Sequence, residues 1–201
     1  MSKIGILGGT FNPIHKGHIQ MADYAKTALE LDKILFIPTY TPPHKDNREL
    51  ACEYDRLNMC KLACKACDGY EVSEIEIKRK GKSYTYETLI ELKELYKDDT
   101  LYLIVGADMF LSLDRWKNPE VIFDNAIIVA IPRNENDAND LNKYYNSVIK
   151  GMGAKSFILT QPLMQVSSTF IRDNIADYNV VSKCLDENVY DYIVKNNLYR
   201  K

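Results

Sequence analysis

The sequence predicts an α/β protein: a doubly wound parallel sheet with helices on both faces and a small helical part at the C-terminus. Short apolar segments alternate along the chain with segments of helical spacing. Two later apolar runs, Leu101–Val105 and Ile127–Ile131, are continuous and bounded by turn residues. Continuous runs are typical of strands buried on both faces, and the alternation of strands with helices is typical of doubly wound folds.

Six segments are expected to form strands. They are Lys3–Leu7, Lys33–Ile37, a less buried segment with Val72, Ile75 and Ile77, and then Leu101–Val105, Ile127–Ile131 and Phe157–Leu159.

Helical spacing marks the segments between and after these strands. The expected helices are one from about His18 that carries Ile19, Ala22, Ala25 and Leu29, then Glu53–Cys67, Tyr86–Tyr96 (with Leu89, Leu92 and Leu95 for packing), Asn139–Lys150, Ser168–Ile175 and Asp186–Asn196. Pro38–Leu50 holds three prolines and is expected to be a loop.

Length and composition favour a single packed domain, residues 1–201, with 167–201 as its C-terminal helical part. The chain has 201 residues, of which 46% are hydrophobic, and a formal net charge of -2. A general nucleic-acid or membrane-surface binder would carry a basic excess, so we expect neither partner. With no apolar run of ~18 residues and no signal-peptide pattern, we expect a cytoplasmic protein, for which a homo-oligomer is compatible with the sequence.

The segment between the first expected strand and the first expected helix carries the strongest chemical pattern, GGTFNPIHKGH from Gly8 to His18. Glycines let backbone N–H groups approach a phosphate, and a helix N-terminus adds positive partial charge. Gly17 removes a side chain between His15 and His18, so both imidazoles can point at one phosphate chain. The pattern predicts a phosphate cradle; the alternative is a glycine turn with two surface histidines.

This segment resembles the HxGH signature of a nucleotidyltransferase superfamily related to the class I aminoacyl-tRNA synthetases, whose fold is Rossmann-like. Its members transfer a nucleotide to phosphopantetheine, glycerol phosphate, flavin mononucleotide or pyridine mononucleotides. Later segments resemble, in order and spacing, those of the bacterial nicotinate-nucleotide adenylyltransferases: Pro42–Lys45, Ser83–Thr85, Gly106–Asp108, Trp116, Val166–Arg172 and the ending Asn197–Tyr199.

The resemblance implies adenylyl transfer from ATP to nicotinate mononucleotide, which gives deamido-NAD and pyrophosphate in NAD biosynthesis. ATP and nicotinate mononucleotide are then the partners, and Mg²⁺ is carried by the ATP phosphates instead of by a metal site of the protein. Because the attacking phosphate is largely dianionic near pH 7, no strong protein base is needed. The protein must align the reactants and stabilise charge on the α-phosphate.

The resemblance also implies the site residues. We expect His18 at the α-phosphate, with His15, Thr10 and Arg172 along the phosphate chain and Lys45 at the substrate phosphate or the transition state. The residues expected to bind ATP are Gly8, Gly9, Thr10, His15, His18, Gly106, Asp108, Ser167, Ser168, Thr169 and Arg172. Those expected to bind nicotinate mononucleotide are Thr10, His44, Lys45, Ser83, Tyr84, Thr85, Trp116 and Lys117.

Three of these assignments have a plain alternative. Asp108 follows a buried strand, where it can accept bonds from ribose hydroxyls or cap a helix. Ser167–Thr169 can cap a helix that carries an exposed Arg172, instead of facing the triphosphate with an arginine fork. Trp116 can be a core residue, whereas the resemblance places it against the pyridine ring, with Thr85 and backbone N–H groups on the carboxylate.

The chain departs from the family at several positions. Asn12 stands where aspartate is commoner, and Lys117 where an aromatic residue often follows Trp116. Ile131-Pro132-Arg133 replaces an Arg-Pro-Gly-like stretch. The geometry on the pyridine side and the role of Arg133 therefore stay open.

Two other chemistries compete with this one, a metal site and an iron–sulfur cluster. His15, His18 and His44 could bind a metal but lack a clear fourth ligand. Cys60, Cys64 and Cys67 match the spacing of radical S-adenosylmethionine enzymes, yet with Leu57 they fall on one helical face, as small buried hydrophobes would. Two further functions stay open: a sibling transferase for another phosphorylated acceptor, and a non-enzymatic nucleotide-binding sensor.

Overall fold

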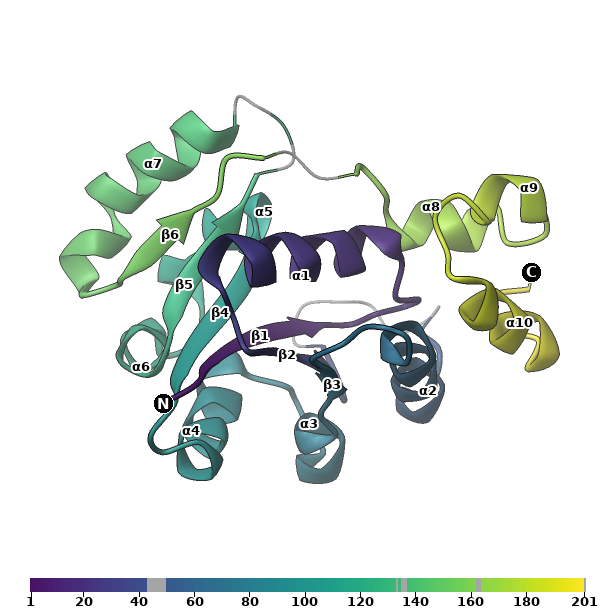
Figure 1. The fold of residues 1–201 in the computed structure, drawn as a ribbon, viewed down its shortest axis with the longest axis horizontal. Helices are drawn as coiled ribbons and strands as arrows, with labels where there is room; N and C mark the ends of the chain where they lie inside the picture. Colours follow the sequence, from purple (N-terminus) through teal and green to yellow (C-terminus); the bar gives the residue numbers. More distant parts are fainter. Residues whose placement is uncertain (43–49, 133, 135–136, 162–163, 201) are drawn as a thin grey trace. The chain divides into compact units, whose positions relative to one another are not determined.

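The structure, a computed structural model, describes residues 1–42, 50–132, 134, 137–161 and 164–200 (Figure 1). The chain groups into two compact units, each made of several segments. The first unit comprises Met1–Leu7, Met21–Leu35 and Tyr84–Leu163, and the second comprises Gly8–Gln20, Phe36–Ser83 and Met164–Lys201.

Six strands form a parallel sheet in the order β3-β2-β1-β4-β5-β6. They are β1 (Lys3–Gly9), β2 (Lys33–Pro38), β3 (Tyr70–Val72), β4 (Thr100–Gly106), β5 (Ile127–Ile131) and β6 (Ser156–Ile158). The chain builds outward from β1 to β3 on one side and from β4 to β6 on the other. This order confirms the predicted doubly wound α/β fold.

The pairings within the first unit show why the continuous apolar runs were reliable signals. β1 pairs with β4 from Lys3↔Thr100 to Ile6↔Leu103, and β4 pairs with β5 from Tyr102↔Ile127 onward. Every residue from 101 to 105 and from 128 to 131 is buried, as expected for strands covered on both faces.

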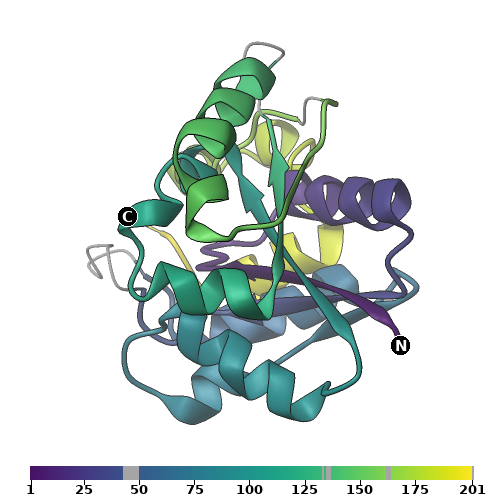
Figure 2. The same ribbon diagram turned by 90° about the vertical axis from the view of Figure 1, so that its left-hand side faces the viewer.

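The helices confirm the alternation that the sequence predicted. They are α1 (Lys16–Leu29), α2 (Glu53–Cys64), α3 (Ile75–Arg79), α4 (Thr85–Leu95), α5 (Ala107–Phe110), α6 (Pro119–Asn125), α7 (Asp137–Ser147), α8 (Ser168–Asp173), α9 (Tyr178–Val181) and α10 (Glu187–Lys195), with 3₁₀ helices η2 (Leu113–Arg115) and η3 (Ile149–Met152). In the first unit, the C-terminal half of α1 and α4 lie on opposite faces of β1 and β4 (Figures 1 and 2). No helix in the described ranges is long and apolar enough to cross a membrane.

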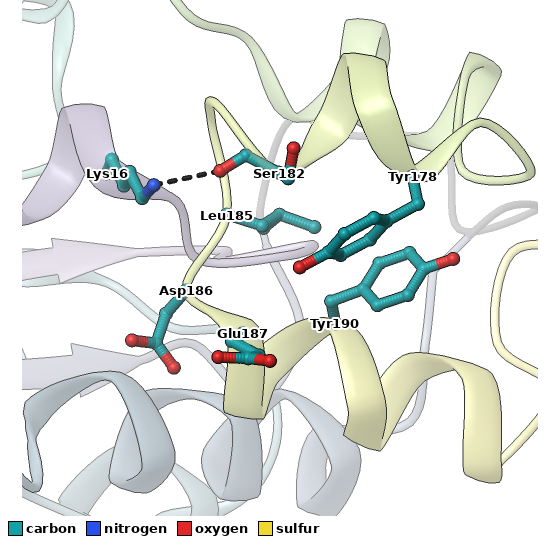
Figure 3. Close-up of a pocket in the computed structure, with 7 residues that line it drawn as sticks. All are labelled: Lys16, Tyr178, Ser182, Leu185, Asp186, Glu187 and Tyr190. Atoms are coloured by element: carbon teal, nitrogen blue, oxygen red, sulfur yellow. Dashed lines mark hydrogen bonds between the residues drawn. The ribbon is translucent and has the colours of Figure 1, made fainter.

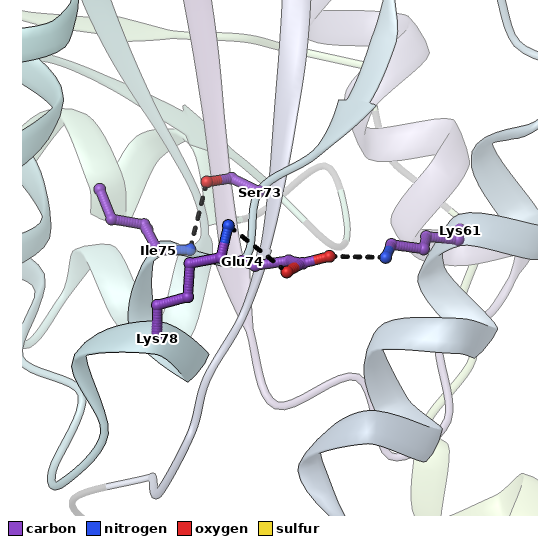
Figure 4. A network of polar contacts seen from close by, with 5 residues as sticks. All are labelled: Lys61, Ser73, Glu74, Ile75 and Lys78. Carbon is purple, nitrogen blue, oxygen red and sulfur yellow. Dashed lines mark hydrogen bonds and ion pairs between the residues drawn. The ribbon is translucent and has the colours of Figure 1, made fainter.

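The predicted third strand is wrong in its second half. Only Tyr70–Val72 forms β3, and Ile75 and Ile77 belong to α3. Ser73 Oγ accepts a hydrogen bond from the Ile75 N–H (3.4 Å) at the point where the helix begins (Figure 4). Two isoleucines two residues apart are too short a pattern to separate a strand from one buried turn of helix.

An ion-pair network fixes this turn from outside the local sequence (Figure 4). The Glu74 carboxylate lies 2.6 Å from Lys61 Nζ of α2 and 3.6 Å from Lys78 Nζ, one turn further along. The hydrogen bond from Lys61 lowers the pKa of Glu74. Lys61 lies thirteen residues before Glu74, so the spacing of apolar residues around Ile75 could not reveal this contact.

Several boundaries also differ. The helix expected to reach Cys67 ends at Cys64, and the one expected to reach Lys150 ends at Ser147 and is followed by η3. Leu95, expected to pack, is 69% exposed.

Candidate phosphate-binding site

The glycine-rich segment Gly8–His18 lies entirely in the second unit, where it leaves β1 and enters α1. Gly8 is exposed, and a Cβ there would meet no atom within 4 Å. A Cβ on Gly9 would lie 3.0 Å from the Phe11 ring. The backbone of this segment, called the phosphate loop below, is therefore open to a ligand at Gly8 and closely packed at Gly9.

His15 and His18 form a stacked pair at the start of α1. Their ring centroids are 3.7 Å apart with an interplanar angle of 26°, and the edge of Phe11 packs against His18 at 5.0 Å. His18 Nδ1 accepts a hydrogen bond from the His15 backbone N–H (3.2 Å). In the neutral ring the proton then sits on Nε2, so His18 presents an N–H donor from its other edge.

Burial keeps His15 uncharged. Its side chain is only 8% exposed, and desolvation lowers its pKa to about 4. In the part of the chain that the structure describes, its buried Nδ1 has no hydrogen-bond partner. A neutral His15 avoids like-charge repulsion within the stacked pair, because two imidazolium rings in contact would destabilise each other.

Gly17 is required by the position of the His15 ring. A Cβ at this residue would lie 3.1 Å from His15 Nδ1 and 3.2 Å from Cε1, with the Met164 carbonyl oxygen at 3.5 Å. The two distances to the His15 ring are shorter than ordinary van der Waals contact, so a side chain here would push the imidazole aside by a few tenths of an ångström. The inference that Gly17 makes room between the histidines thus has a direct geometric basis.

Helix α8 is bonded to the phosphate loop by two side chains. Arg172 Nη1 donates to the Asn12 carbonyl (3.0 Å), and Ser168 Oγ donates to the Pro13 carbonyl (3.0 Å). Ser167 caps the helix, since its Oγ accepts from the Phe170 N–H (3.1 Å). The plain alternative is therefore right about a serine cap but wrong about an exposed arginine.

Asn12 ties the loop to two other segments. Its Oδ1 accepts from the Ala51 N–H (3.0 Å) and from the Tyr199 hydroxyl (2.8 Å). Burial raises the pKa of Tyr199, so this hydroxyl stays protonated and acts as a donor. The C-terminal tail thus contributes directly to the support of the loop.

Arg56 of α2 was not singled out from the sequence, although it belongs to the same surroundings. It is 0% exposed, and its guanidinium donates to the carbonyls of Thr10 (2.8 Å), Tyr40 (2.9 Å) and Ala51 (3.0 Å). A signal did exist: Arg56 lies four residues before Cys60 on the buried face of the predicted helix, where a charged residue is unusual.

Two residues expected to contact ATP lie in the first unit, at the carboxyl end of β4. Gly106 is the N-cap of α5, and Asp108 is an exposed residue in its first turn. The alternative that Asp108 itself is the helix N-cap is therefore wrong.

The residues expected around the pyridine ring also lie mostly in the first unit. Tyr84 is the N-cap of α4 and Thr85 its first residue. Trp116 is only partly buried, so it is not a core residue, and its Nε1–H donates to Ser112 Oγ (3.2 Å). Lys117 Nζ lies over the Tyr84 ring, 4.2 Å from its centroid.

Ser83 belongs to the second unit, where its hydroxyl is engaged by the backbone. It is 7% exposed, and its Oγ accepts from the Tyr40 N–H (2.9 Å). His44, Lys45 and Arg133 lie outside the described residues.

A pocket of about 240 Å³ in the second unit is not this site. Of the phosphate loop it contains only Lys16, whose Nζ donates to the Ser182 carbonyl (2.8 Å). Figure 3 shows Tyr178 and Tyr190 on the far side of the pocket, with ring centroids 4.7 Å apart. The two acidic side chains that line it, Asp186 and Glu187, suit it poorly for an anionic substrate.

The described residues give little support to a metal or cluster chemistry. Among them, no three His, Cys, Asp or Glu side chains gather as a metal site would require. All five cysteines are free thiols. Burial raises the pKa of Cys60 and that of Cys64 to about 12, whereas an iron–sulfur cluster needs thiolates.

Comparisons with known proteins agree along the whole chain. A family model described as cytidylyltransferase-like matches residues 6–174. A relative from Clostridium perfringens, named as a probable nicotinate-nucleotide adenylyltransferase, is 40% identical over 201 residues, with both chains covered completely. A relative of the same name from Lachnoclostridium phytofermentans is 35% identical over 199 residues, which cover 99% of this chain and 100% of the relative.

Solved structures of 20% identity share the fold. The nicotinic acid mononucleotide adenylyltransferase of Plasmodium falciparum complexed with APC superposes with a TM-score of 0.78. The same enzyme complexed with NaAD gives 0.79. In both cases the match covers 99% of this chain and 98% of the other.

Proposed function

Because the chain belongs to the cytidylyltransferase-like family, and within it to the nicotinate-nucleotide adenylyltransferases, we propose that it transfers the adenylyl group of ATP to nicotinate mononucleotide. The products are deamido-NAD and pyrophosphate, in the biosynthesis of NAD. The observation that carries the proposal is the stacked His15–His18 pair in a glycine-rich loop at a helix N-terminus.

In the proposed reaction the phosphate of nicotinate mononucleotide attacks the α-phosphate of ATP, and pyrophosphate leaves. The attacking oxygen needs no deprotonation by the protein near pH 7. His18 donates from Nε2 to the α-phosphate, where negative charge grows in the transition state. Its orientation is set before substrate arrives, because Nδ1 is held by the His15 N–H.

The other residues of the phosphate loop and α8 hold the rest of the triphosphate. We assign backbone N–H groups of Gly8, Gly9 and Thr10, the neutral His15 ring, and the Arg172 guanidinium to the phosphate chain. A guanidinium forms two parallel bonds to a phosphate more readily than an ammonium does. The remaining ATP contacts are assigned to Gly106, Asp108, Ser167, Ser168 and Thr169.

Acceptor recognition is assigned to a second group of residues. Thr85 and neighbouring backbone N–H groups hold the nicotinate carboxylate, and Trp116 lies against the pyridine ring. Lys45 contacts the substrate phosphate or the transition state, and the remaining contacts are assigned to Thr10, His44, Ser83, Tyr84 and Lys117. The Ser83 hydroxyl already accepts from Tyr40, so we expect its contribution to come mainly through the backbone.

Mg²⁺ enters with ATP and is held chiefly by phosphate oxygens and water, as Mg²⁺ usually is in nucleotide sites. We further propose that residues 1–201 work as one catalytic domain and that the enzyme is cytoplasmic. The five free thiols suit a reducing compartment.

Pyrophosphate release tests the proposal against its two rivals. The protein is incubated with MgATP and, separately, nicotinate mononucleotide, phosphopantetheine, flavin mononucleotide or glycerol phosphate, and the product mass is determined. We expect deamido-NAD with nicotinate mononucleotide and at most slow release with the others. A faster reaction with another acceptor identifies a sibling transferase. If ATP binds but no pyrophosphate is released with any of the acceptors, the protein is a nucleotide-binding sensor.

A further inference from the structure

Arg56 is a buried cation whose bonds reach three separate segments of the second unit. Nη1 donates to the Thr10 carbonyl (2.8 Å), Nη2 to the Tyr40 carbonyl (2.9 Å) and Nε to the Ala51 carbonyl (3.0 Å). The side chain is 0% exposed. Each nitrogen of the guanidinium therefore holds one backbone carbonyl in a fixed plane.

The partners of Arg56 are neutral. In the described part of the chain, no carboxylate lies within ion-pair distance of its guanidinium. Burial lowers the pKa of Arg56, yet arginine stays protonated in proteins. Burying such a charge is costly, and an apolar side chain of similar volume would fill the space but leave the three carbonyls without these donors. Packing alone does not explain an arginine here.

Of the three carbonyls, one belongs to the phosphate loop and two belong to residues that the loop-bound Arg56 links to it. Thr10 belongs to the phosphate loop, whereas Tyr40 and Ala51 flank, in sequence, the segment that carries His44 and Lys45. Ala51 is also bonded from its N–H to Asn12 Oδ1 (3.0 Å). Arg56 thus joins the loop to both flanks of that segment through a single rigid group.

We propose that Arg56 is a positioning residue for adenylyl transfer. Its guanidinium fixes the Thr10 peptide, and with it the direction in which the loop N–H groups face the triphosphate. It also fixes the two flanks of the segment that carries Lys45. The inference rests on the proposed function, but it assigns a role to a residue that touches no substrate itself.

Arg56→Lys tests the role because it keeps the charge and loses the planar fork. We expect kcat for deamido-NAD formation to fall 10- to 100-fold, since small misplacements of reacting groups have effects of this size. The KM for ATP should change less than fivefold, because the residues that contact the triphosphate remain. A folded Arg56→Lys enzyme with kcat within threefold of wild type would overturn the proposal.

A stability control separates positioning from folding. Leu89→Ala removes a fully buried side chain from α4 in the first unit and should lower Tm by several degrees. Measured well below its Tm, this variant should keep kcat within threefold of wild type. An equal loss of kcat in both variants at equal loss of Tm would mean that Arg56 acts only through stability.

A measurement on the wild type covers the case in which Arg56→Lys does not fold. The Arg56 Nε–H resonance, assigned by triple-resonance NMR, should exchange slowly with solvent and shift when ATP binds without acceptor. Fast exchange, or no shift at saturating ATP, would contradict the proposal. Since this experiment needs no acceptor, its result is distinct from failure of the proposed function, which would appear as wild-type inactivity with nicotinate mononucleotide.

Discussion

The two imidazole rings at the start of α1 have different surroundings. His15 is buried and kept neutral by desolvation. His18 is more exposed and is oriented by the bond from the His15 N–H to its Nδ1. In the proposed function, His18 therefore donates to the α-phosphate from a fixed orientation, and the neutral His15 ring contacts the phosphate chain.

His18→Ala should reduce turnover far more than ATP binding. The donor acts where charge develops, and loss of one such group costs on the order of 3 kcal/mol, or ~100-fold in rate. Steady-state kcat and an ATP dissociation constant, measured on the same folded variant, separate the two effects. Turnover within threefold of wild type would remove His18 from the mechanism.

The lowered pKa of His15 predicts that the stability of the fold depends on pH. Its pKa falls from 6.5 to about 4 in the folded protein. Between these two pH values, His15 is therefore protonated in the unfolded chain but neutral in the folded chain. Stability linked to His15 is thus full above pH 6.5 and declines as pH falls toward 4. At ~1.4 kcal/mol per unit, the total loss is about 3 kcal/mol.

The measurement compares unfolding free energies of wild type and His15→Gln between pH 7 and pH 4. Carboxyl groups titrate in both proteins, so only the difference reports on position 15. The wild-type curve should fall more steeply. Parallel curves would show that His15 keeps an ordinary pKa.

At the scale of elements, the sequence was most informative where a pattern is long and self-contained. Lys3–Leu7, Leu101–Val105 and Ile127–Ile131 were located to within two residues because burial on both faces leaves an unbroken apolar run. The turn of α3 was missed because the Lys61–Glu74 ion pair that supports it joins distant residues.

The same distinction holds for the site. The phosphate loop is one contiguous motif, so His15, His18 and Gly17 could be singled out together. The position of Arg56 on the buried face of the predicted helix could have marked it as unusual, but not its role, because its partners at Thr10, Tyr40 and Ala51 are spread over more than forty residues. Support of a site by backbone bonds across the fold has no local signature.

Helix α2 carries a further prediction, for the cysteines. Cys60 is fully buried, Cys64 nearly so, and Cys67 lies in the turn beyond the helix. Replacing all three by alanine should leave turnover within threefold, since none touches the proposed substrates. Unfolding free energy should fall by about 1 kcal/mol per buried site. Iron-dependent brown colour in anaerobically purified wild type, absent from the triple variant, would contradict this view.

At the scale of the whole molecule, the proposed function depends on the choice of acceptor. Nicotinate and nicotinamide mononucleotides differ by a carboxylate against an amide of nearly the same shape, so steric fit cannot separate them. A carboxylate only accepts hydrogen bonds, whereas the amide presents one acceptor and one NH₂ donor. Backbone N–H groups near Thr85, as proposed, satisfy both carboxylate oxygens and leave one N–H facing the amide NH₂.

With the amide, one charge-assisted hydrogen bond is lost and one buried N–H donor is left without an acceptor. Together these cost roughly 2–3 kcal/mol, a factor of about 30 to 150 in catalytic efficiency. The Thr85 hydroxyl can rotate to accept from NH₂, but fixed backbone N–H groups cannot. The decisive measurement is the ratio of kcat/KM for the two mononucleotides at saturating MgATP. We predict a preference for nicotinate mononucleotide of about 30-fold or more; a ratio near one, or in favour of nicotinamide mononucleotide, would contradict the proposed acceptor.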